Sequence, residues 1–219
     1  MYKIVVLILA LLVSNTSQAN LISVIDFTGN NEGVEQSFDF AIDGVSVNVS
    51  AWNANVKSNQ KFKKKWRQVD SNYGVYKGST GLGVKSNEKD GVDLDGGKKN
   101  RFKKDPDEGL LFEFSELVNF YGFFASDLGS DDDINLSLVE FISPGVIKTT
   151  DIFVDIGSDE DEDLFGVFPG VQGLAFMVWV DGKTDDVRID DIGFTRVPEP
   201  STLLLLALGI IGVRFRRKA

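Results

Sequence analysis

Apolar side chains recur at every second position through most of this chain, and this period constrains the fold more than any other feature of the sequence. In the segment 45–51, Val45, Val47, Val49 and Ala51 alternate with serine and asparagine, and the segment 134–138 repeats the pattern. A period of two puts alternate side chains on opposite faces of a strand, giving one apolar and one wet face. Spacing near 3.6, which is typical of helices, is almost absent. The sequence therefore predicts a domain built of strands.

Further short apolar runs are separated by turn residues such as Asp43-Gly44, Asp90-Gly91 and Asp181-Gly182. Roughly ten short strands with glycine-rich turns indicate an all-β fold, and we expect an antiparallel β-sandwich. Besides the two segments above, the expected strands are 21–28, 38–42, 110–114, 118–125, 146–155, 173–181 and 187–197.

Aromatic residues are numerous, with 17 phenylalanines and three tryptophans. Those within apolar strand segments are expected to fill the space between two sheets. They are Phe112, Phe114, Phe120, Phe124, Phe176 and Trp179. A second set has polar or basic neighbours and is a candidate either for further core packing or for an exposed platform that stacks on sugar rings. It comprises Trp52, Trp66, Tyr73 and Tyr76.

The chain of 219 residues has no cysteine and no histidine, and it has 33 acidic against 23 basic side chains. Disulfides, Ser-His-Asp and Cys-His nucleophile systems, the usual His/Cys zinc sites and His-ligated haem are therefore excluded. Five of the basic side chains, Lys3 and four near the C-terminal end, lie in the two terminal segments. Without them the chain has 18 basic against 33 acidic side chains, a net charge near −15. This charge argues against nucleic acid as a partner.

The first 19 residues have the pattern of a secretory signal peptide. Lys3 precedes an apolar run at 4–13, and Ser17-Gln18-Ala19 places small residues at positions −3 and −1 of a cleavage site. The run is too short for a typical transmembrane helix. We therefore expect cleavage after Ala19 and a single exported domain at 20–196, a length that suits one core and not two typical domains.

The segment 197–219 has three parts in order. Pro198 and Pro200 fix φ and remove two backbone donors, which favours an extended strip open to proteolysis. As a helix, the apolar run 203–213 would span only about half to two-thirds of a ~30 Å hydrocarbon core. The cations that follow should stay on the cytoplasmic side and snorkel to the interface; they are Arg214, Arg216, Arg217 and Lys218. We expect a short transmembrane helix that holds the exported chain in the inner membrane.

The order Val197-Pro198-Glu199-Pro200, apolar helix and Arg-rich end resembles the PEP-CTERM sorting signal of Gram-negative bacteria. The resemblance covers residues 197–219 and implies that a membrane-embedded exosortase recognises the tail and cleaves near the Pro-Glu-Pro motif. An ordinary C-terminal membrane anchor is the alternative. Because this family often occurs in genomes that make exopolysaccharide, the resemblance also implies residence at the cell surface or in the extracellular matrix.

Four short segments in the body of the domain resemble strand markers of exosortase-dependent surface proteins that have a jelly-roll body. They are 81–84, 92–96, 110–114 and 187–192. The last is also similar to the closing strand of many carbohydrate-binding modules. This resemblance implies a jelly-roll-like sandwich but transfers no binding residues, because sandwiches serve many functions.

Three acidic clusters supply the oxygen ligands that calcium prefers. They lie at 131–133, at 159–163 and at 185–186 with 190–191, and the candidate ligands are Asp131, Asp133, Asp159, Asp161 and Asp163. The spacing of an EF-hand loop is not met, because Leu164 stands where glycine is needed and Gly170 where glutamate closes the loop. The residues that follow Asp93 and Asp95 do not have the EF-hand spacing either. Solvated loops are the alternative, so calcium is a cofactor that the sequence leaves open.

Two basic runs, 57–67 and 98–104, interrupt the acidic background. They are either solvated loops or a local binding site for an anionic polysaccharide, to which Phe62, Trp66 and Phe102 would add stacking contacts.

These features predict an exported surface or matrix protein that an exosortase processes and that has a structural or adhesive role, in association with exopolysaccharide. The alternative is a calcium-dependent, lectin-like carbohydrate-binding module. A third possibility is a glycoside hydrolase that uses paired carboxylates. Since no carboxylate pair is singled out by its position, we do not expect an enzyme.

Overall fold

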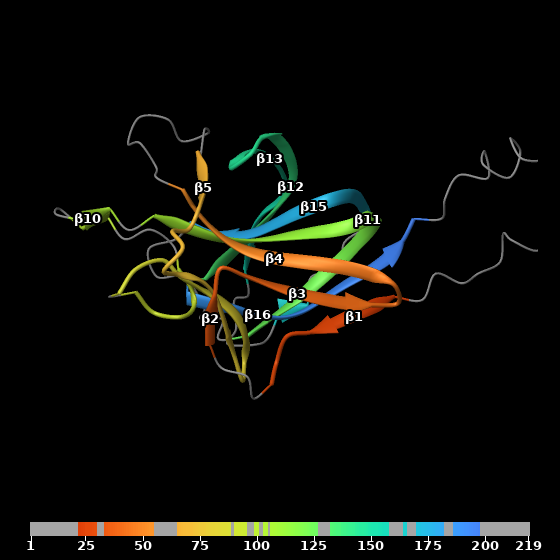
Figure 1. The fold of residues 1–219 in the computed structure, drawn as a ribbon, viewed down its shortest axis with the longest axis horizontal. Helices are drawn as coiled ribbons and strands as arrows, with labels where there is room; N and C mark the ends of the chain where they lie inside the picture. Colours follow the sequence, from red (N-terminus) through yellow and green to blue (C-terminus); the bar gives the residue numbers. More distant parts are fainter. Residues whose placement is uncertain are drawn as a thin grey trace, which may run out of the picture.

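The computed structural model describes residues 22–29, 33–54, 65–88, 90–95, 99–100, 103–104, 106–126, 132–157, 164–165, 170–181 and 186–197. Within these ranges the chain forms sixteen strands and no helix, so the all-β prediction is confirmed (Figure 1). No helix long and apolar enough to cross a membrane therefore occurs in these ranges. The predicted signal peptide, its cleavage site at Ala19 and the predicted C-terminal helix lie outside them.

The strands are listed here in chain order. They are β1 (Ser23–Asp26), β2 (Gly33–Glu35), β3 (Ser37–Ile42), β4 (Val45–Ala54), β5 (Trp66–Gln68), β6 (Gly74–Gly78), β7 (Gly81–Lys85), β8 (Leu94–Asp95), β9 (Lys99–Asn100), β10 (Lys103–Lys104), β11 (Asp107–Ser126), β12 (Asp133–Ser143), β13 (Val146–Gly157), β14 (Leu164–Phe165), β15 (Val171–Val180) and β16 (Asp186–Arg196).

Every strand pair in the described chain is antiparallel, as predicted. Fourteen strands form one branched sheet, whose main path runs β13-β12-β15-β11-β16-β7-β6-β2. Strand β4 joins this path through β11 and carries β3 and β5, while β1 and β8 pair with β16 and β14 pairs with β11. Strands β9 and β10 form a separate hairpin. The arrangement of the branched sheet as a sandwich or a jelly roll stays a prediction.

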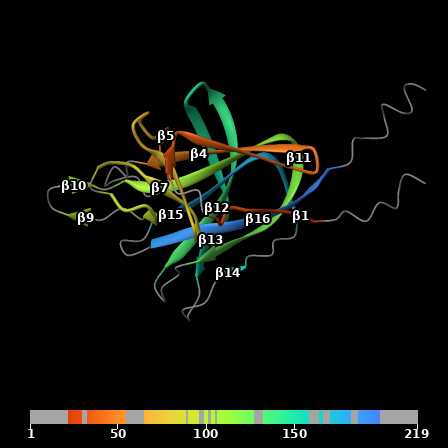
Figure 2. The ribbon, with the colours of Figure 1, turned by 60° about the horizontal axis from the view of Figure 1, so that its bottom comes forward.

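Strand β11 lies at the centre of the sheet and changes partners along its length. Its first part, as far as Phe114, pairs with β4 on one side and with β15 on the other. The register with β15 shifts between Glu113 and Val118, and the second part pairs with β16. The sequence predicted two strands, at 110–114 and 118–125. They are one strand, because a β-bulge bends a strand without ending it (Figure 2).

Side chains from both parts of β11 meet in the main core. The ring centroid of Phe114 lies 5.0 Å from that of Phe194, 6.0 Å from that of Phe176 and 6.5 Å from that of Phe120, each pair edge to face. Such pairs stabilise a core by about 0.5–1.5 kcal/mol beyond the burial of their area. Phe112, Phe114, Phe120 and Phe176 are all buried, as the sequence predicted.

Phe124 is an exception to the predicted core. It is only half-buried, whereas its neighbour Phe123 is fully buried in the main core. The register between β11 and β16 shifts between Phe120 and Gly122. This shift moves the inward-facing positions from even to odd residue numbers, so a strict period of two continued from Phe120 selects the wrong phenylalanine.

A second apolar cluster lies on the other face of the ladder formed by β4, the first part of β11 and β15. It contains all three tryptophans of the chain, Trp52, Trp66 and Trp179, with Leu111 and Met177 among their neighbours. None of the tryptophans is more than 4% exposed. Because β5 pairs with β4, it brings Trp66 to 5.8 Å from Trp179, edge to face. The burial of Trp179 is as predicted, and the exposed-platform alternative for Trp52 and Trp66 is wrong.

The tryptophan cluster also covers strand positions that the sequence placed on a wet face. Ser50, Asn135 and Ser137 are buried. The Ser137 hydroxyl accepts a hydrogen bond from Nε1 of Trp179 at 2.8 Å and donates one to Asp151 at 2.8 Å. Buried polar groups need such partners. The alternation at 134–138 is therefore real, but its polar side chains serve the packing of the tryptophans.

The first and last strands of the described chain pair with each other. In β1 and β16, Ser23 lies opposite Phe194 and Asp26 lies opposite Asp191. Both views show that β1 begins and β16 ends at one end of the domain, beside the bend of β11 and the β3–β4 turn (Figures 1 and 2). Asp43 and Gly44 form the predicted turn, with φ angles of 51° and 82°, as a tight hairpin requires. The chain therefore enters and leaves the domain at the same end.

We predict that Phe114→Ala lowers the free energy of unfolding by about 3–5 kcal/mol, because three ring contacts are replaced by a cavity. Phe141→Ala is the matched control, since that ring is 48% exposed, and it should cost less than about 1 kcal/mol. Urea unfolding of both variants measures the difference. Equal losses would contradict the central position of Phe114 in the core.

Candidate functional site

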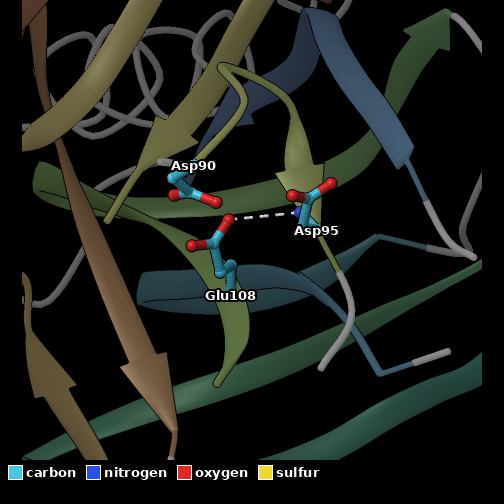
Figure 3. A group of neighbouring side chains, drawn as sticks. All are labelled: Asp90, Asp95 and Glu108. Carbon is cyan, nitrogen blue, oxygen red and sulfur yellow. Dashed lines mark hydrogen bonds between the residues drawn. The ribbon is translucent and has the colours of Figure 1, made fainter. Parts of the chain in front are cut away.

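Three carboxylates from separate parts of the chain converge in one place (Figure 3). Asp90 lies between β7 and β8, Asp95 is the last residue of β8, and Glu108 is the second residue of β11. One carboxylate oxygen from each lies within 4.8 Å of the others. We call this group the carboxylate triad. It lies where β11 begins, at the end of the domain away from the β11 bend (Figure 1).

The segment 90–95 is held against β7 by its backbone. Gly83 permits this close approach, because a Cβ atom there would lie 1.9 Å from the carbonyl oxygen of Val92. The N–H of Val84 donates to the carbonyl oxygen of Asp93 at 3.1 Å. Leu94 is fully buried and pairs with β16. The next residue, which ends β8, is thereby fixed in the triad.

Arg188 of β16 holds the same segment from its other side. It forms an ion pair with Asp93 and donates a hydrogen bond to Thr80. Its guanidinium carbon also lies 5.5 Å from the ring centroid of Tyr76. Tyr76 is half-buried, and Tyr73 is half-buried against the main core, so neither is the freely exposed ring that a stacking platform needs.

Hydrogen bonds orient the carboxylates of the triad. Asp90 accepts from the N–H of Ser86 at 2.5 Å and from its hydroxyl at 2.8 Å. Glu108 accepts from the N–H of Asp95 at 3.2 Å and is only 1% exposed. Burial, followed by the negative charge of Asp90, raises the pKa of Glu108 well above its usual value of 4.5. Hydrogen bonds from Ser86 and from the Asp95 backbone act in the opposite direction.

The geometry of the triad leaves two ways to balance its charge. Carboxylates this close to one another repel, so either Glu108 holds a proton or a cation compensates. All the ligand atoms are oxygens, which suit a hard cation such as calcium or magnesium and not zinc or copper. Calcium takes six to eight oxygens, so the triad would supply part of its shell and backbone carbonyls or water the remainder. The residues present fit such an ion.

The calcium ligands predicted from the sequence are not those of the triad. Asp133 is the first residue of β12, lies opposite Gly157 and is half-buried. The others lie outside the described residues and are Asp131, Asp159, Asp161 and Asp163. Of the predicted sorting motif, Val197 is described and the remaining residues are not; they are Pro198, Glu199, Pro200, Arg214, Arg216, Arg217 and Lys218. The N–H of Val197 donates to the carbonyl oxygen of Leu117 at 3.2 Å.

The sequence marks none of the three members of the triad as a cation ligand. The residues around Asp95 do not have EF-hand spacing, and Asp90 with Gly91 has the pattern of a turn. Glu108 is separated from Asp95 by 13 positions and lies at the start of a strand, where no local pattern marks it. The two meet only in the folded chain, where β8 pairs with β16 and the 90–95 segment lies against β7.

The comparisons with known proteins concern the other end of the domain. Residues 196–218 match the family model of the PEP-CTERM protein-sorting motif. The chain carries a PEP-CTERM sorting motif. The PEP-CTERM motif indicates an exported protein that is held transiently at the membrane through its C-terminal segment and is targeted by an exosortase. No curated protein matches the chain. Because the match begins at Arg196, the last residue of β16, the motif is joined directly to the folded domain.

We predict that Glu108→Gln removes part of the pH dependence of stability when divalent cations are absent. The pKa of Glu108 is higher in the folded than in the unfolded chain, so its stabilising contribution is complete below pH 4.5 and is lost as the pH rises through the folded pKa. The slope is at most about 1.4 kcal/mol per pH unit. The neutral glutamine cannot titrate, so the variant should lose less stability than the wild type between pH 4.5 and 8.

Urea unfolding in EDTA at several pH values measures this difference. Burial also raises the pKa of Glu113, and burial together with the charge of Asp26 raises the pKa of Asp191. Because both groups titrate in the wild type and in the variant alike, the difference between the two proteins isolates Glu108. Glu140→Gln changes an exposed side chain and should keep the slope of the wild type. The same slope in Glu108→Gln as in the wild type would contradict the account of the triad.

Proposed function

We propose that the protein is a structural or adhesive component of the cell surface or extracellular matrix, delivered there by exosortase processing. The observation that carries this proposal is the sorting motif, which begins at the last residue of β16. A domain joined so closely to a membrane tail is exported and presented as one folded unit. We also propose that its branched sheet forms a jelly-roll-like sandwich, with the two parts of β11 in opposite layers around the main core.

A binding role suits the described residues better than turnover. Glycoside hydrolysis needs two carboxyl groups that flank the scissile bond and reach it from opposite sides. Glu108 is 1% exposed and is therefore screened from a polymer chain. We propose on this ground that the protein is not an enzyme and that its carboxylates serve stability or ion binding.

Association with an anionic exopolysaccharide is supported by the β9–β10 hairpin. The hairpin carries Lys99, Lys103 and Lys104, and its register puts Lys104 opposite Lys99. The hairpin lies at the end of the domain away from the β11 bend, where a polymer outside the membrane would meet it (Figures 1 and 2).

The intact mass of the protein in the envelope, medium and exopolysaccharide fractions tests this proposal. We predict that the mature protein starts at Asn20 and ends within the segment 197–200, and that it co-purifies with the exopolysaccharide until high salt releases it. In cells without the exosortase the C-terminal tail should be retained. Recovery of an untrimmed chain from the cytosol would contradict export. Recovery only in a membrane fraction from which high salt does not release the protein would contradict the matrix role.

Calcium-dependent binding is a second candidate function, and the carboxylate triad is the observation that favours it. Three carboxylates within 4.8 Å of one another offer a hard cation a partly formed shell. A bound cation would replace the proton on Glu108 and link the 90–95 segment to β11. A lectin-like module that uses such an ion would then present its ligand site at the end of the domain that carries the triad.

Thermal unfolding with calcium and with EDTA tests this candidate. A ligand at about 100 times its Kd stabilises a protein by about 2.7 kcal/mol, which corresponds to roughly 5–10 °C in Tm for a domain of this size. Glu108→Gln should abolish the gain, whereas Asp133→Asn, outside the triad, should keep it. An unchanged Tm of the wild type on chelation, or an equal calcium gain in Glu108→Gln, would exclude the triad as a calcium site.

A further inference from the structure

The chain leaves the domain beside the bend of β11, where backbone hydrogen bonds fix its position. Val118 pairs with Arg196 on one side and with Gly173 on the other. One residue further along, the N–H of Val197 donates to the carbonyl oxygen of Leu117 at 3.2 Å. The sorting tail therefore starts at a fixed point of the folded domain.

Large apolar side chains are exposed around this point. Leu117 is 42% exposed, and Leu174, which follows Gly173 in β15, is 54% exposed. Ile22 is 54% exposed, precedes β1 and lies over Gly193 of β16. We call these three residues the exit surface. Exposed leucine and isoleucine side chains that gather at one end of a domain indicate an interaction site more than scattered ones do.

Among the described residues, the charged groups next to the exit surface are one ion pair and one carboxylate. The guanidinium group of Arg196 forms an ion pair with Glu116, including a bond from Nη2 to Oε2 of 2.8 Å. Arg196 also donates to the carbonyl oxygen of Asp43 at 3.4 Å, and the Asp43 carboxylate accepts from the Ser23 hydroxyl at 2.6 Å. Such a surface is not a basic patch that would select anionic lipids. It suits a zwitterionic headgroup region.

The length of the tail limits how far the domain stands from the membrane. Five residues, 198–202, separate Val197 from the apolar run and span at most about 17 Å. The run 203–213 adds about 16 Å as a helix. The two lengths together fall short of the ~40–45 Å thickness of a bilayer with its headgroups. With the cations 214–218 at the cytoplasmic headgroups, the end of β16 cannot rise above the outer headgroup region.

We propose that, before processing, the exit surface lies in the outer headgroup region of the membrane that holds the tail, with Ile22, Leu117 and Leu174 in contact with lipid. This inference rests on the proposed anchoring by the C-terminal segment. It places the Pro-Glu-Pro motif at the depth that a membrane-embedded protease reaches. It also directs the carboxylate triad away from the membrane, since Glu108 and Leu117 are nine residues apart on β11, which is at most about 30 Å at ~3.3 Å per residue.

The absence of cysteine allows a direct test with single labels. Leu117→Cys and Leu174→Cys report on the exit surface, and Glu88→Cys, exposed near the triad, is the control. Each full chain is purified from cells without the exosortase, labelled with an environment-sensitive fluorophore and reconstituted in phosphatidylcholine vesicles. Some vesicles contain lipid with a quencher close to the headgroup. We expect quenching at positions 117 and 174 to exceed that at position 88 by roughly twofold or more, because interfacial groups insert about 5–10 Å into this region.

Flotation of the vesicles separates the possible outcomes. If the chain does not float with lipid, both the anchoring and the docking of the exit surface are contradicted. If the chain floats but the three labels are quenched equally, the anchoring stands and the docking is overturned. Cooperative urea unfolding of each labelled chain, with the midpoint of the wild type, shows that the substitutions leave the fold intact.

Discussion

The pairing of β11 with several strands along its length is the constraint on which the remainder of the structure depends. Its first part pairs with β4 and β15, and its second part pairs with β15, β14 and β16. Phe114, just before the bend, contacts rings from β11, β15 and β16, so the two parts close around one core. Because β16 leads directly into the sorting motif, this same ladder decides where the membrane tail leaves the domain. The bend thus joins the packing of the core to the point at which the sorting motif begins.

Local periodicity predicts the longer strands, because the alternation of apolar and polar side chains is a property of neighbouring residues. It does not predict β2, β14 or the short strands from β5 to β10, which have too few residues to show a period. The turn at Asp43-Gly44 was equally visible, since few residue types adopt two successive positive φ angles. The faces of the strands were harder to predict. Phe124 was assigned to the core because a bulge that changes the phase leaves no mark in the sequence. The polar neighbours of Trp52 leave exposure open as an alternative, because its cover, Trp66 on β5, is brought over it only by tertiary packing.

The sorting motif and the carboxylate triad differ in the same way. The sorting tail is recognised from the order of proline, apolar and basic residues, which requires no tertiary structure. The carboxylate triad depends on β8 pairing with β16 and on the close approach of Val92 to Gly83, so it is visible only in the fold. The features lie at opposite ends of the first part of β11. A domain held at the membrane by one end would therefore present the other end, with the triad and the β9–β10 hairpin, to its surroundings.

Amide hydrogen exchange of the processed domain, read by mass spectrometry, tests most directly whether β11 is one strand common to the whole fold. Residues that open only on global unfolding exchange with the free energy of that transition. The account predicts slow exchange throughout 107–114 and 118–126, with the same dependence on denaturant in both parts. Fast exchange in one part while the other stays protected would contradict it, because the two halves of the sheet would then unfold as separate units.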